Sequence, residues 1–138
     1  TLGESVKRAG HMCDEVGSEV ELGIHLCYGD PGHKHIVEPS DLGTFVAFAN
    51  GIIDTASRKI NFMHMAVPKD RNDEAYFAPL NRLSMLAETR LILGLVHHTG
   101  TTSPLIDPIL YIINALHPNY YHIPYQPPVA PQDEPLFP

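Results

Sequence analysis

Hydrophobic and polar residues alternate along residues 19–28, EVELGIHLCY, in the pattern of a strand. Positions 20, 22, 24 and 26 form an apolar face, and His25 and Cys27 lie on the other face. Two further apolar runs, INFMHMAV and LILGLV, are nearly continuous, which is typical of parallel strands that are buried on both faces. The pattern predicts strands near residues 19–28, 59–67 and 90–97.

A helical pattern follows each predicted strand. Residues 40–54 begin with a Ser-Asp start signal and continue with apolar residues at spacings of three, four and seven. Residues 79–88 open on a proline that can occupy the first turn, and residues 108–117 form a third apolar segment after a proline. Residues 1–18 are expected to form a preceding helix and its loop. The chain therefore contains three strand-helix units.

Equivalent points in the three units predict the topology. His25, His64 and His97 lie 39 and 33 residues apart, which is the length of a βαβ crossover. The right-handed crossover rule then predicts adjacent parallel strands in chain order, with the helices on one side. Such a sheet leaves two strand edges and an apolar inner face open, so we expect a partial (β/α)8 TIM barrel with marginal stability or self-association.

Two regions of different composition are expected. Residues 1–123 form the partial barrel domain, and residues 124–138 contain six prolines and form an irregular, polyproline-like tail. The chain opens on Thr1 without an initiator Met, which suggests processing or a truncated piece of a longer chain.

Composition narrows the classes of function. The 138 residues are 43% hydrophobic and 18% charged, as in an ordinary soluble domain. A formal net charge of −7 argues against a nucleic-acid partner, and no apolar run reaches the roughly 18 residues of a membrane helix. Two cysteines, Cys13 and Cys27, are too few for a disulfide scaffold, so we expect a reduced, cytoplasmic setting.

Histidines gather at the predicted strand ends, where parallel α/β folds bind ligands. His25 and Cys27 project to the same side of a strand and can share one Zn²⁺. Further donors are His64 and either His97 or His98, with others in the first loop at His33, His35 and Glu38. The alternative is structural: a small buried cysteine and a histidine that hydrogen-bonds a loop.

Two residues are candidates for a catalytic role. Arg71, beside the expected pocket, can clamp a carboxylate or phosphate of a small-molecule substrate with two hydrogen bonds. A solvated turn with local Asp–Arg pairing explains it equally well. Asp30, like Glu38, can orient a histidine or act as a general acid or base, or simply begin a turn.

Three segments carry a family resemblance: ELGIHLCYGDPGHKHIVEPSDL, INFMHMAVPKDRNDEAYFAPLNRL and ETRLILGLVHHTG. They resemble cobalamin-independent methionine synthases, in the superfamily shared with uroporphyrinogen decarboxylase, over about residues 18–100. The resemblance implies a (β/α)8 barrel in which a His-x-Cys pair, a Glu at the next strand end and a second Cys hold zinc. His25 and Cys27 match that pair. The implied chemistry is zinc-assisted methyl transfer to a thiol.

The sequence departs from this pattern at two ligands. His64 or a neighbouring Met stands where the family has Glu, and the second Cys has no counterpart. We therefore expect a weak zinc site, and little methyl transfer by this chain alone. Two alternatives remain open. The chain is a non-catalytic fragment or a subunit completed by a partner chain, or it is a metal-free decarboxylase-like relative that uses Arg71, Asp30 and the histidines.

Overall fold

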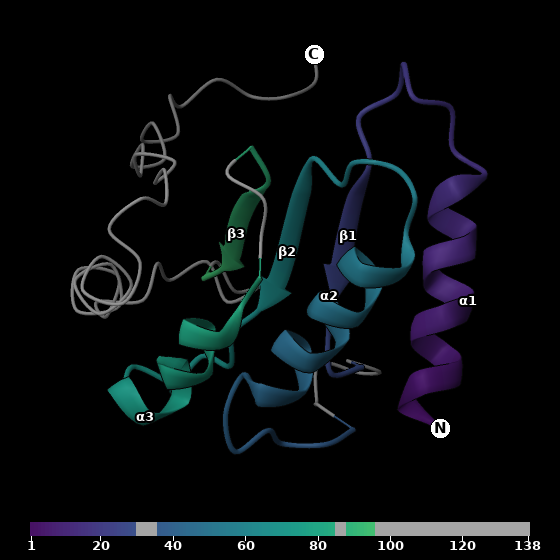
Figure 1. Cartoon of the computed structure of the whole chain (residues 1–138). Helices are drawn as coiled ribbons and strands as arrows, with labels where there is room; N and C mark the ends of the chain where they lie inside the picture. Colours follow the sequence, from purple (N-terminus) through teal and green to yellow (C-terminus); the bar gives the residue numbers. More distant parts are fainter. Residues whose placement is uncertain (30–35, 85–87, 96–138) are drawn as a thin grey trace, which may run out of the picture.

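Three short parallel strands form an open sheet in the computed structural model, which describes residues 1–29, 36–84 and 88–95 (Figure 1). The fold is α/β, with strands and helices alternating along the chain. The strands are β1 (Gly23–Leu26), β2 (Phe62–Ala66) and β3 (Arg90–Gly94), and their order is β1-β2-β3. Both pairings are parallel, so the predicted adjacent strands in chain order are confirmed.

The helix α1 (Leu2–Asp14) precedes the sheet, as expected for residues 1–18. Thr1 and Glu4 form a capping box at its first turn. The helix packs against α2 (Gly43–Thr55) at two glycines, Gly10 of α1 and Gly51 of α2. A Cβ atom on Gly10 would stand 2.6 Å from Cγ2 of Thr55, so the two helices lie closer together than larger residues would allow.

The helix α2 begins three residues after the predicted start at residue 40. Leu42 is its N-cap residue, and the backbone N–H of Gly43 donates to Oδ1 of Asp41 at 2.7 Å. The buried side of α2 carries the periodic apolar residues of the sequence, among them Phe45 and Ile52. Figure 1 shows α2 lying across the sheet.

The helix predicted at residues 79–88 begins earlier and ends earlier. Asp73 caps the short helix α3 (Glu74–Phe77) by accepting a hydrogen bond from the backbone N–H of Tyr76 at 3.0 Å. The chain continues as a 3-10 segment, η2 (Ala78–Arg82), with Pro79 near its start. Proline lacks the N–H that an α-helix needs at that point, and the tighter 3-10 turn tolerates the change.

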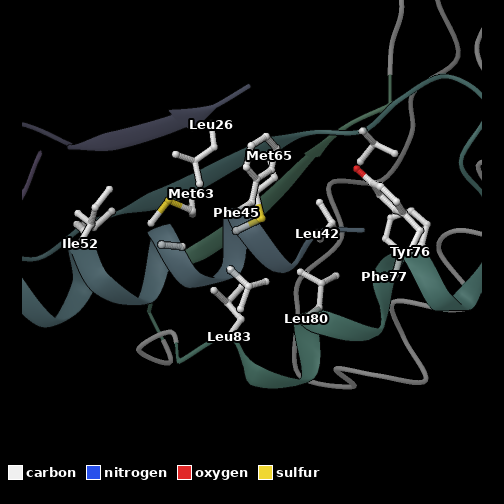
Figure 2. Close-up of a cluster of buried hydrophobic side chains, with 14 of the residues drawn as sticks. Leu26, Leu42, Phe45, Ile52, Met63, Met65, Tyr76, Phe77, Leu80 and Leu83 are labelled. Atoms are coloured by element: carbon white, nitrogen blue, oxygen red, sulfur yellow. The ribbon is translucent and has the colours of Figure 1, made fainter. Parts of the chain in front are cut away.

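The hydrophobic core lies between α2 and one face of the sheet (Figure 2). Leu26, Met63 and Met65 contribute from the strands, and α2, α3 and η2 contribute the other side. On the opposite face of the sheet, the side chains of Phe62 and His64 are half-buried in the described structure, which shows that this face is only partly covered. The prediction that β2 and β3 are buried on both faces is therefore wrong for the residues that the structure describes.

The first strand is shorter than the predicted range of residues 19–28. The backbone N–H of Val20 donates to the carbonyl oxygen of Gly17, and the Asn61 side chain accepts the N–H of Leu22 at 2.9 Å. These bonds take the chain out of the strand ladder before Gly23. The guanidinium of Arg58 fixes this loop by donating to three of its carbonyl oxygens, those of Val16, Gly17 and Val20.

Several predictions fall on residues outside the described ranges. They are the helix at residues 108–117, the proline-rich tail at residues 124–138, and the candidate residues Asp30, His33, His35, His97 and His98. Among the residues that the structure describes, no helix combines the length and the apolar character needed to cross a membrane.

Candidate functional site

Two histidines on neighbouring strands meet on the face of the sheet opposite the hydrophobic core, which we call the open face. His25 on β1 and His64 on β2 are register partners, so the sheet places their side chains next to each other on one face. Their Nδ1 atoms are 2.6 Å apart, and the rings are nearly parallel, with centroids 4.8 Å apart and an interplanar angle of 19°. The predicted convergence of His25 and His64 is present, but His64 lies in the middle of β2 rather than at its end. Cys27, which was expected to converge with them, joins no group of three metal-binding side chains among the described residues.

The short contact requires the two rings to share one proton. One Nδ1–H donates and the other Nδ1 accepts, because two N–H groups cannot face each other at this distance. Burial lowers the pKa of His64 below its ordinary value of 6.5, and the charge on His25 lowers it further. His25 is exposed and His64 is half-buried, so the His25 side of the pair is more accessible to solvent than the His64 side.

The rest of the open face is apolar with one ion pair. Phe62 and Ile92 lie on it next to the histidines by strand alternation and register. At the amino-terminal end of the face, Nη2 of Arg90 lies 3.1 Å from Oε1 of Glu21 in an exposed salt bridge. The histidine pair is therefore set among apolar side chains, with this ion pair at the other end of the strands.

The two cysteines lie in different environments. Cys27 follows β1 and is exposed, two residues beyond His25. Cys13 belongs to the hydrophobic core, and burial raises the pKa of its thiol, so Cys13 is a poor thiolate. Within residues 1–29, 36–84 and 88–95, no three His, Cys, Asp or Glu side chains are grouped as a metal site. The histidine pair supplies two donors of the kind that zinc prefers.

Arg71 contacts its own loop, the segment before α2 and the helix α3. Its Nη2 donates to the carbonyl oxygen of Ser40 at 2.8 Å, and its Nε lies 3.0 Å from Oδ2 of Asp73 outside hydrogen-bonding geometry. The guanidinium also lies over the ring of Tyr76, 4.7 Å from its centroid. The local pairing with Asp73 matches the structural alternative that the sequence left open for this arginine.

Sequence reasoning did not identify a tyrosine pair on the helix side of the sheet. The hydroxyl groups of Tyr28, which follows β1, and Tyr76 of α3 are 2.9 Å apart. Tyr28 also stacks on Phe45 of α2, with ring centroids 4.1 Å apart. Burial raises the pKa of both phenols, so neither is suited to act as a base. No spacing signal in the sequence marks this contact, which depends on the tertiary fold.

The lowered pKa of His64 predicts a loss of stability in acid. The unfolded chain takes up a proton near pH 6.5 while folded His64 still resists it, so the free energy of unfolding should fall as the pH drops below about 6.5. Urea unfolding of the metal-free protein at a series of pH values measures this. His64→Gln should have a shallower dependence. His25→Gln should keep part of it, since burial of His64 is the larger cause. Equal slopes in the wild type and His64→Gln would contradict the prediction.

No protein-family model matches this chain, and neither a curated protein nor a solved structure matches it. The candidate site therefore stands on the residues and the geometry described above.

Proposed function

We propose that this chain belongs to a methionine synthase-like (β/α)8 barrel and contributes part of a zinc site that assists methyl transfer to a thiol. The observation that carries the proposal is the contact between Nδ1 of His25 and Nδ1 of His64 at 2.6 Å on the open face. Two imidazole nitrogens on adjacent parallel strands are a suitable pair of zinc ligands. Cys27, which follows on the same strand path, supplies the third donor in this proposal.

The barrel part of the proposal is supported by the arrangement of the layers. The strands are parallel and adjacent in chain order, and the core lies on the side that faces α2. In a (β/α)8 barrel the helices cover the outer face and the inner face carries the side chains near the active site. His25 and His64 lie on the face that would be the inner one.

In the proposed reaction, bound zinc would supply a thiol of lowered pKa: the substrate thiolate would attack the methyl group of the donor, forming a sulfur–carbon bond while the bond from the methyl group to the donor breaks and the demethylated donor leaves. His25 and His64 would hold the site through their Nδ1 atoms, and the ring that carries its proton on Nδ1 would carry it on Nε2 instead. His97 is the proposed fourth donor, and Asp30 is a proposed catalytic group. Arg71 acts on a substrate in this proposal only if it leaves the carbonyl oxygen of Ser40. The chemistry needs reduced cysteines, which agrees with the proposed cytoplasmic setting.

Zinc binding tests the proposal directly. The full chain is dialysed against zinc, and the bound metal is counted by elemental analysis and titrated against a chromophoric chelator. We expect weak binding of one zinc ion, reduced at least tenfold by His25→Ala, His64→Ala or Cys27→Ala. His11→Ala is the matched control, because His11 is an exposed histidine in the last turn of α1. Equal affinity in His11→Ala and His64→Ala would overturn the proposed ligands.

A second candidate function is supported by the open sheet. Among the described residues, β1 and β3 each have one strand neighbour and one free edge. The chain could therefore be a non-catalytic subunit whose sheet is completed by another chain, including a second copy of itself. Sedimentation at several concentrations in the same zinc experiment separates the two: a larger species without zinc favours the subunit, and a monomer that binds zinc favours the barrel.

A further inference from the structure

The last residue of β3, Gly94, lies against the ring of His64. A Cβ atom built on Gly94 would stand 2.9 Å from Nε2 and 3.1 Å from Cε1 of His64. The next nearest atom is Cα of Ala66 at 3.5 Å, which is an ordinary van der Waals contact. Gly94 does not have a positive φ angle, so its backbone conformation suits alanine. Among the residues that the structure describes, the ring of His64 is therefore the close neighbour that excludes a side chain at this position.

The imidazole of His64 lies between residues of the two neighbouring strands, β1 and β3. Its Nδ1 faces His25 on β1, and its Nε2 edge faces Gly94 on β3. A shift of the ring toward β1 would compress the contact between the two Nδ1 atoms, which are already 2.6 Å apart, at the short limit of a hydrogen bond, or displace the exposed side chain of His25. A methyl group at position 94 would therefore displace the ring of His64 and disturb its contact with His25.

We infer that Gly94 is a positioning residue, which seats the imidazole of His64 and directs its Nδ1 toward His25. This position of the His64 ring depends only on the described contacts. Its consequence for metal rests on the proposed zinc site: because Nε2 faces the backbone of β3, Nδ1 is the nitrogen that His64 offers to a ligand. Glycine inside a strand often marks such a close approach. Gly94 thus sets which nitrogen of His64 is used.

Spectroscopy of the metal-free chain tests the seat. With ¹⁵N-labelled histidine at one fixed pH, long-range ¹H–¹⁵N spectra report the protonation and hydrogen bonding of each ring nitrogen. Gly94→Ala should shift the Nδ1 signals of both His25 and His64. The control is Gly3→Ala, since a Cβ on Gly3 in α1 meets nothing within 4 Å. Unchanged Nδ1 signals in Gly94→Ala would overturn the inference.

A double-mutant cycle gives an independent test. Gly94→Ala should destabilise the protein when His64 is present, and it should have little effect in a His64→Ala background, where only the 3.5 Å contact with Ala66 remains. The same loss in both backgrounds would mean that Gly94 serves the backbone alone, and would overturn the inference.

Zinc titration then separates the inference from the proposed function. If the wild type binds zinc, Gly94→Ala should weaken the affinity by about 10–100-fold, as loss of an orienting partner does at metal sites. Wild-type affinity in Gly94→Ala would overturn the inference. If the wild type binds none, the zinc proposal fails, and the spectra and the mutant cycle still decide whether Gly94 seats His64.

Discussion

Replacing Ile52 with alanine is expected to lower the free energy of unfolding by about 2–5 kcal/mol. Ile52 lies on α2 with 0% of its surface exposed and belongs to the core between α2 and the sheet (Figure 2). Alanine removes buried methyl groups and leaves a cavity in a core that can close over it only in part. For a domain whose total stability is typically about 5–15 kcal/mol, this loss is severe.

The matched control is the same substitution at an exposed isoleucine. Ile36 is 70% exposed, so Ile36→Ala should change the free energy of unfolding by less than about 0.5 kcal/mol. Urea unfolding followed by circular dichroism measures both variants. If the two substitutions had similar effects, the side chain of Ile52 could not lie in the core as described.

The second large effect is expected from Tyr28→Phe, which should cost about 1–3 kcal/mol. Phenylalanine can keep the stacking on Phe45 but removes the hydroxyl group that lies 2.9 Å from the hydroxyl of Tyr76. Tyr76 is fully buried, so its hydroxyl loses this partner in a place where water does not replace it. The cost arises mainly from this buried polar group.

The substitution of the partner, Tyr76→Phe, and the double variant test this explanation. Removing both hydroxyl groups leaves no orphaned phenol at Tyr76, so Tyr28→Phe with Tyr76→Phe should cost less than the sum of the two single variants. Thermal and urea unfolding of the three variants give the cycle. Strict additivity would show that the two hydroxyl groups do not interact.

The order and direction of the strands could be predicted from the sequence because they depend on periodicity and spacing. Alternation at Ile24 and Leu26 and the 39-residue separation of His25 from His64 were sufficient for the parallel pair. The element ends were less accurate, because side chains determine them. The Asn61 side chain accepts the N–H of Leu22 and so shortens β1, and Asp73 starts α3 ahead of Pro79, where the sequence pattern places the start of the helix.

The candidate site was predictable in part. His25 and His64 were expected to converge, since they occupy the same point of successive units, and the register confirms their contact. The tyrosine pair joins residues 48 positions apart through α3, whose start was wrongly placed, so the sequence could not bring them together. The role of Gly94 depends on a distance of a few ångströms between two strands, which no pattern of residue types encodes.

The central position of β2 also determines when this sheet can assemble during synthesis. Each described strand pairing includes β2, so β1 has no described partner while the nascent chain ends before residue 62. Until then, α1 and α2 can pack on each other, but the backbone of β1 has no described strand to pair with. Parallel pairing over such separations forms slowly, because the loop must close before any contact is made. The backbone hydrogen-bonding groups of β1 on the side of β2 therefore stay without their strand partner until the segment that contains α2 and β2 has been synthesised.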